Sequence, residues 1–163
     1  MKLVYVNATL DLRLETLFSN PVFQSAVASL VVAQFIKSII SVLRAKSTSF
    51  KDLVITFLWK TGGMPSSHSA MAVSLSVAIA LTEGFSSLFI LSMFFALVVT
   101  RDALGVRRAA GLQAKALNRL GSELAIKYDI SFKSVKEVHG HTAPEVGFGA
   151  VLGFFIALAF CTL

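Results

Sequence analysis

The apolar positions of the chain gather in four long runs that are separated by shorter polar stretches. The runs cover residues 21–43, 64–82, 87–104 and 145–163, and each approaches the roughly 20 apolar residues that a helix needs to cross a bilayer. The pattern predicts an all-α fold, a polytopic membrane helical bundle of about four spanning helices, in which residues 1–163 form one integral-membrane domain. A soluble helical core is the alternative, and the length of the runs argues against it.

The polar stretches predict further elements that do not span. Residues 1–20 mix leucines with charged residues and predict an N-terminal interfacial segment, because no apolar run of a signal peptide follows Lys2 directly. Residues 105–144 form a polar segment that begins with an amphipathic helix over 106–128, which is too polar to span. The single cysteine, Cys161, lies in the last apolar run and excludes a disulfide framework.

Composition agrees with a membrane protein, since 55% of the residues are hydrophobic and 15% are charged. The net charge of +6 is attributed to loops near anionic headgroups, and no basic run with interleaved aromatic residues suggests nucleic acid as a partner. Glycine and alanine recur along 64–82 and 145–163, and small residues let membrane helices approach closely. Such faces suit packing within the chain or against a second copy, and we expect a homodimer.

Four spans of alternating direction bring their polar ends to one membrane face. The residues at these ends are Lys37, Arg44, Ser66, His68, Arg101, Asp102, Arg107, Arg108, His141 and Glu145. All Lys and Arg residues except Lys2 and Arg13 fall on this face, which the positive-inside rule assigns to the cytoplasm. An odd number of spans would change this assignment.

The polar stretch 60–72, KTGGMPSSHSAMA, directly precedes the second run. Pro65 suits the first turn of a helix, and Ser66, Ser67 and His68 then crowd the helix start. Unpaired N–H groups and a partial positive charge make a helix start an anion site. Because a histidine there exchanges a proton near neutral pH, the stretch predicts one wall of a phosphate pocket at a membrane surface.

Two histidines, a carboxylate and several cations at one face suit phosphoryl transfer. Catalysis of that reaction depends mainly on positioning and on charge stabilisation. The acidic residues near the face are scattered and do not form the cluster that is typical of a magnesium site. The pattern therefore favours a metal-independent, histidine-based mechanism without a cofactor over a histidine–carboxylate metal site.

Three segments carry a resemblance to a known family. These are TGGMPSSHSA (Thr61 to Ala70), DALGVRRAAGLQA (Asp102 to Ala114) and GHTAPEV (Gly140 to Val146). Over about residues 34–158 the chain resembles the divergent type 2 phosphatidic acid phosphatase family, which is related to acid phosphatases and vanadium haloperoxidases.

The resemblance implies roles for the residues that match the motifs of this superfamily. In the first motif, Lys37 and Arg44 would bind phosphate, and Ala45 stands in place of the motif's proline. In the second motif, Ser66 with nearby N–H groups, including that of Ser67, would hold phosphate oxygens. His68 would be the general acid, and Ser67 replaces a glycine.

The third motif places the nucleophile. His141 would attack phosphorus and Glu145, in place of an aspartate, would orient it. Val135 stands where the motif has an arginine, so Arg107 or Arg108 would supply that charge from another helix. Surface binding of lipid headgroups is the other interpretation of the two arginines.

The function that we expect is hydrolysis of a lipid phosphate or diphosphate, with the substrate entering from the bilayer. Two alternatives stay open: a non-catalytic phospholipid-binding or scaffolding membrane protein that keeps the pocket, and a transporter, against which the absence of an internal repeat argues. Structural interpretations also stay open at single positions. His68 would be part of a helix cap, His141 and His139 would be loop residues, and Asp102 would pair with Arg101 or another cation.

Overall fold

The structure, a computed structural model, describes residues 14–44, 63–137 and 140–163, and of Arg44 the backbone alone. The long helices are α2 (Pro21–Arg44), α4 (Ser67–Glu83), α5 (Ser87–Leu104), α6 (Val106–Tyr128) and α7 (Ala143–Thr162). No strand occurs among the described residues. The predicted all-α membrane bundle is confirmed, while most of the predicted N-terminal interfacial segment lies outside the described part of the chain.

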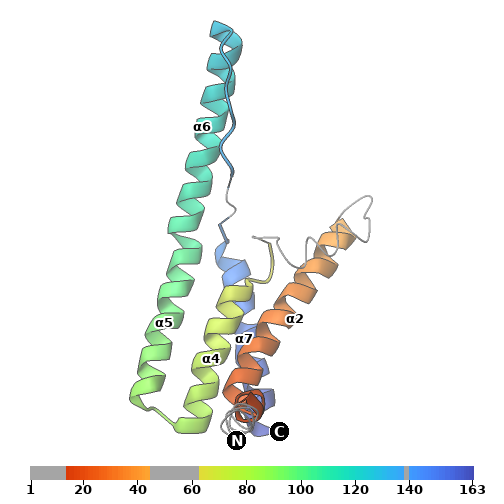
Figure 1. Cartoon of the computed structure of the whole chain (residues 1–163), viewed down its shortest axis with the longest axis vertical. Helices are drawn as coiled ribbons and strands as arrows, with labels where there is room; N and C mark the ends of the chain where they lie inside the picture. Colours follow the sequence, from red (N-terminus) through yellow and green to blue (C-terminus); the bar gives the residue numbers. More distant parts are fainter. Residues whose placement is uncertain (1–13, 45–62, 138–139) are drawn as a thin grey trace, which may run out of the picture.

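Within the described residues, three helices are long and apolar enough to cross a membrane. They are α2 over Pro21–Leu43, the continuous α5 and α6 over Ser87–Tyr128, and α7. The second apolar run forms α4, which has 17 residues and a rise of about 25 Å. Helix α4 packs against α7, α2 and α5, and Figure 1 shows it among these three helices. The second run is therefore the central helix of the bundle.

The interface between α4 and α7 is made of small residues. Ser69, Ala70 and Ala78 of α4 are fully buried. A Cβ atom at Gly149 or at Gly153 of α7 would overlap the carbonyl oxygen of Ser66 or of Ala70, respectively. The glycine and alanine faces are thus used for packing within the chain, and the homodimer stays a prediction.

Local hydrogen bonds set the starts of α4 and α7. The Oγ atom of Ser66 accepts a hydrogen bond from the backbone N–H of Ser69 at 3.4 Å, so Ser66 is the N-cap of α4. Pro65 precedes this cap, and its predicted place in the first turn is wrong because the serine hydroxyl supplies the cap one residue later. Helix α7 begins at Ala143, two residues before the predicted start, since Thr142 and Glu145 form a capping box.

The predicted amphipathic helix, α6, extends away from the bundle. It follows α5 after a single break at Gly105, and it projects well beyond the ends of α2, α4 and α7 (Figure 1). No residue of α6 is buried. The segment 130–137, which has no regular secondary structure, returns alongside α6 towards the bundle. We call α6 with this segment the arm.

Candidate functional site

The sequence predicted that the polar ends of the helices share one face, and the helix directions agree. The end of α2, the start of α4, the junction of α5 with α6 and the start of α7 lie at the same end of the bundle (Figure 1). The turn between α4 and α5, the start of α2 and the C-terminal end of α7 lie at the opposite end. At these helix ends lie Lys37, His68, Arg107, His141 and Glu145, and we call these five residues the histidine site.

His141 is buried at the start of α7. The residue is 6% exposed, and its Nδ1 atom lies 3.3 Å from Oε2 of Glu145. The backbone N–H of His141 also donates to the carbonyl oxygen of Ala103 in α5 at 3.2 Å. The predicted histidine–carboxylate pair is thus formed, and the histidine is held between two helices.

Glu145 has a second contact that fixes its carboxylate. Its Oε2 atom accepts a hydrogen bond from the backbone N–H of Thr142 at 2.9 Å, as part of the capping box of α7. Because the carboxylate is held there, it favours the tautomer of His141 that carries its proton on Nδ1. The Nε2 atom then keeps its lone pair, which is the state that a nucleophile needs.

The surroundings of His141 favour its neutral form. Burial is the largest effect and lowers the pKa of His141 below its ordinary value of 6.5. The hydrogen bond and the charge of Glu145 raise this pKa, whereas the positive charges of Lys37 and Arg107 lower it further. At neutral pH the imidazole is therefore mostly uncharged.

The starts of α4 and α7 are joined directly. The backbone N–H of Ser66 donates to the carbonyl oxygen of Glu145 at 2.9 Å. The hydroxyl of Ser66 is fully buried and lies 3.0 Å from the hydroxyl of Ser69, and Ser67 is buried as well. The two predicted phosphate-binding serines therefore build the start of α4, where backbone N–H groups without helical partners are the remaining donors.

At the start of α4, His68 is exposed, whereas Ser66, Ser67 and Ser69 around it are buried. The positive charges of Arg107 and Lys37 act on it, as do His141 and the carboxylate of Asp102. The second histidine thus faces the same group of charges as His141, although it comes from a different helix.

Lys37 is a buried cation of the site. It lies on α2 and is 4% exposed, and a Cβ atom at Gly63 would lie 3.8 Å from its Cγ atom. Its charge acts on both His68 and His141. Burial of a cation beside two histidines agrees with the predicted anion site, because an anion there would meet little competition from water.

Arg107 and Arg108 differ in their contacts, and the sequence did not decide which of them supplies the positive charge of the site. Arg107 donates from Nε to Oδ2 of Asp102 at 2.7 Å, and its charge acts on both site histidines. Both arginines are exposed, but the charge of Arg108 is not among those that act on the two histidines. The backbone of Arg108 packs so closely on Gly140 that a Cβ atom there would overlap it. Arg107 is therefore the arginine of the histidine site, and Asp102 pairs with it.

Position 135 lies away from the site. The backbone of Val135 is hydrogen bonded to the side chain of Asn118, which is about 16 Å further along α6 than Arg107. An arginine at position 135 would therefore extend from the arm and not from the site. The predicted roles of the Arg44 side chain and of His139 fall outside the described residues.

Sequence reasoning did not find Thr142, Ala103 or Asn118. The spacing of Thr142 and Glu145 is a readable capping-box signal, whereas the other two act through tertiary contacts. No group of three or more His, Cys, Asp or Glu side chains in the described ranges could hold a metal ion.

An apolar groove lies beside the histidine site. It has a volume of about 280 Å³ and runs between α2 and α7. Its lining residues include Ile36 and Met64, the sequence neighbours of Lys37 and Pro65, as well as Phe148. The groove therefore adjoins the start of α4, through Met64 and Pro65, and the part of α2 that carries Lys37.

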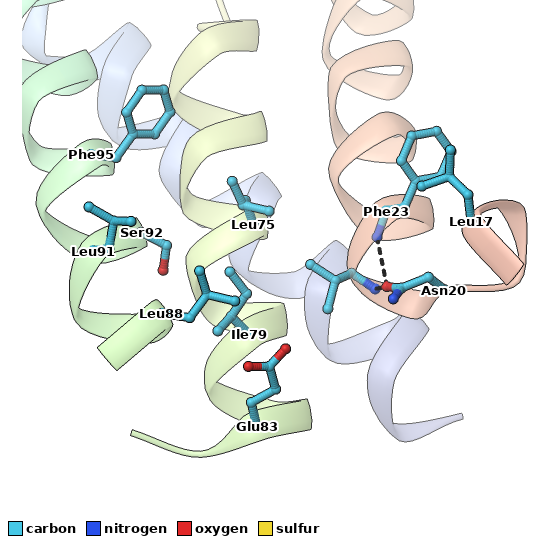
Figure 2. A pocket seen from close by; sticks show the side chains of 11 residues that line it. Leu17, Asn20, Phe23, Leu75, Ile79, Glu83, Leu88, Leu91, Ser92 and Phe95 are labelled. Atoms are coloured by element: carbon cyan, nitrogen blue, oxygen red, sulfur yellow. Dashed lines mark hydrogen bonds between the residues drawn. The ribbon is translucent and has the colours of Figure 1, made fainter. Parts of the chain in front are cut away.

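A larger cavity, of about 610 Å³, lies at the opposite end of the bundle. Figure 2 shows its lining, with Leu75 and Ile79 of α4 between α2 and α5. Glu83 is the charged residue of this lining. A carboxylate repels phosphate, so this cavity does not suit the anion that the histidine site would bind.

Fold and site together define a helical membrane protein with a histidine–cation site at one end of its bundle. Residues 18–156 match the family described as the Divergent PAP2 family, and the chain belongs to this family. It is 36% identical over 154 residues to a Bacillus subtilis (strain 168) protein named "Uncharacterized membrane protein YuiD", covering 87% of this chain and 94% of that protein. No solved structure matches the chain.

Proposed function

We propose that the protein is an integral-membrane phosphatase that hydrolyses a lipid phosphate or diphosphate through His141. The observation that carries this proposal is the contact of 3.3 Å between His141 Nδ1 and Glu145 Oε2, at a histidine on which the charges of Lys37 and Arg107 also act. The contact orients a neutral nucleophile, and the second histidine, His68, is subject to the same two positive charges. A nucleophile, a second histidine and cations are the groups that phosphoryl transfer requires.

In the first step, Nε2 of His141 attacks the phosphorus atom and the bond from phosphorus to the lipid oxygen breaks. His68 gives its proton to the departing oxygen. Lys37, Arg107 and the N–H groups at the start of α4 stabilise the charge on the other phosphoryl oxygens. In the second step, water attacks the phosphohistidine, His68 takes a proton from this water, and phosphate leaves with Nε2 restored.

The apolar groove between α2 and α7 supports a lipid substrate. Its wall contains apolar residues next to Lys37 and to the start of α4, so a chain lying in it would bring a phosphate headgroup towards Lys37 and the N–H groups of this helix start. The volume of about 280 Å³ is at the low end of the range for small-molecule pockets. Such a groove suits a single hydrocarbon chain that enters from the bilayer.

We assign the histidine site to the cytoplasmic face. The Lys and Arg residues of the described ranges lie in the site-end half of the bundle or on the arm beyond it. The connections are short, so the positive-inside rule supports this orientation.

A second candidate is a phospholipid-binding membrane protein without turnover. The burial of the Ser66 and Ser67 side chains and the distant position of Val135 favour it, because both reduce the number of donors at the phosphate. The two candidates share the binding site and differ only in hydrolysis.

Phosphate release from purified protein separates the two candidates. Detergent-solubilised protein would be assayed with phosphatidic acid and with an isoprenoid diphosphate in the presence of EDTA. We expect release by the wild type and none by His141→Gln, while Glu83→Gln at the opposite end keeps full activity. Binding of these lipids without release by the wild type would establish the second candidate instead.

A further inference from the structure

The segment that leads to His141 is fastened along α6. Its first residue, Ile130, donates from its backbone N–H to the carbonyl oxygen of Ala125 at 3.2 Å. Further on, the Nδ2 atom of Asn118 donates to the carbonyl oxygen of Val135 at 2.8 Å, and Oδ1 of Asn118 accepts the N–H of Val135 at 2.7 Å. Asn118 also donates to Oε1 of Glu137 at 3.0 Å. The arm is thus held by hydrogen bonds at several points.

Asn118 takes the place of a neighbouring strand. One amide side chain satisfies both the N–H and the C=O of Val135, as a partner strand would do. Because both bonds go to the same residue, they fix the register of the segment and not only its distance from α6. A slip by one residue would break both bonds.

Small residues on the same face of α6 let the segment approach. Gly111, Ala114, Asn118, Gly121 and Ala125 recur at intervals of three and four, which places them on one face of the helix, and each is less exposed than its neighbours. At Gly121 the ring of Phe132 lies so close that a Cβ atom would overlap it. This face of α6 is the surface on which the returning segment 130–137 packs.

The residues that follow the segment contact α6 and the end of α5. Gly140 packs on the backbone of Arg108, and the N–H of His141 donates to the carbonyl oxygen of Ala103 in α5. Contacts at Asn118, Arg108 and Ala103 thus follow α6 and the end of α5. The pairing of His141 with Glu145 is local to the start of α7, whereas the contacts of the segment hold the backbone of His141 against α5.

We propose that Asn118 is a positioning residue for His141, which it places by fixing the register of Val135 on the arm. Asn118 lies about 16 Å along α6 from Arg107 and does not touch the reacting atoms. The importance of this placement for catalysis rests on the proposed function, but the placement itself does not.

The test measures the titration of His141 by NMR in detergent-solubilised protein, with its signal assigned as the one missing in His141→Gln. The groups that face this histidine are Glu145 on α7, Lys37 on α2, Arg107 on α6 and His68 on α4. Asn118→Ala leaves all four groups in place. If the segment loses its register, His141 becomes less buried, and its midpoint should rise towards 6.5.

Two further variants sharpen the test. Gly121→Val disturbs the packing of the segment on α6 at Phe132 and leaves the Asn118 amide in place. It should also raise the pKa midpoint of His141, and it replaces Asn118→Ala in the test if that variant does not fold. Gln113→Ala removes an exposed side chain of the same helix and should leave the midpoint unchanged. An unchanged His141 midpoint in folded Asn118→Ala or Gly121→Val would overturn the proposal.

Kinetics then separate this proposal from the proposed function. Asn118→Ala should lower kcat on the order of 10²-fold, as expected for a misplacement of about 1 Å, with little change in KM because Lys37 and Arg107 stay in place. A shifted His141 midpoint in a protein without any phosphatase activity would support the positioning role and refute the phosphatase. An active wild type with the same kcat and midpoint in Asn118→Ala would do the reverse.

Discussion

The backbone N–H of Ser66 donates to the carbonyl oxygen of Glu145 at 2.9 Å. This single bond joins the start of α4, which carries His68, to the first turn of α7, which follows His141. The packing of α4 on α7 therefore sets the distance between the two helix starts that carry or follow the two histidines.

Gly149 keeps these two helix starts in contact. We expect Gly149→Ala to lower the free energy of unfolding by about 1–3 kcal/mol, a usual cost of overpacking, because the added Cβ atom would overlap the carbonyl oxygen of Ser66. Thermal unfolding in detergent would measure this loss. Gly147→Ala on the same helix is the control, since a Cβ atom there meets nothing within 4 Å. Equal stability of the two variants would contradict the described contact.

Substitutions of Glu145 can separate its two roles. Glu145→Gln keeps the side-chain acceptor of the capping box but removes the charge beside His141. We expect it to lower kcat by about 10- to 100-fold, as for loss of an orienting group, with unfolding changed by less than about 0.5 kcal/mol. Glu145→Ala should have the same kinetic defect and an additional loss of about 1 kcal/mol. Full activity of Glu145→Gln would show that the charge is not needed.

The two arginines next to each other in the sequence should behave differently. Arg107→Gln removes a charge that acts on both histidines, and we expect KM for a lipid phosphate to rise at least about tenfold, the effect of one lost charged hydrogen bond. Arg108→Gln removes a charge that is not among those acting on the two histidines and should leave KM within about twofold. Steady-state kinetics of both variants would measure this, and equal effects would place both arginines on a general cationic surface.

The pH dependence should report the lowered pKa of His141. Protonation removes the lone pair from Nε2, so activity should be lost as the pH falls through this pKa, at a midpoint below 6.5. Since Glu145 raises the pKa, the acidic midpoint should move to lower pH in Glu145→Gln. Profiles of kcat/KM for both proteins with the same substrate would show the shift, because ionisation of the substrate is common to them. An identical midpoint would mean that another group titrates.

The sequence predicted the parts of this architecture that depend on local pattern. The four apolar runs became α2, α4, α5 and α7, since length and hydropathy alone mark such helices. Their alternating directions were enough to bring His68 and His141 to one end. The spacing of four between His141 and Glu145 was enough to predict their pairing at a helix start.

The remaining features depend on tertiary register. The sequence did not decide between Arg107 and Arg108, because the choice rests on how α6 continues α5 after Gly105. It placed Val135 where the family motif has an arginine, but the bonds of Asn118 hold that position on the arm. Gly149 could have packed against a second copy, and only the observed contact with Ser66 shows that it packs within the chain.

The most direct test of the histidine mechanism is a search for phosphohistidine. Purified protein would be mixed with phosphatidic acid carrying a labelled phosphate, stopped within milliseconds at alkaline pH, where phosphohistidine persists, and digested for mass spectrometry. We expect a phosphoryl group on His141 during turnover, and none in His141→Gln, whose phosphate release should fall on the order of 10³-fold or more. Turnover with no label on His141, or an equal rate in His141→Gln, would contradict it.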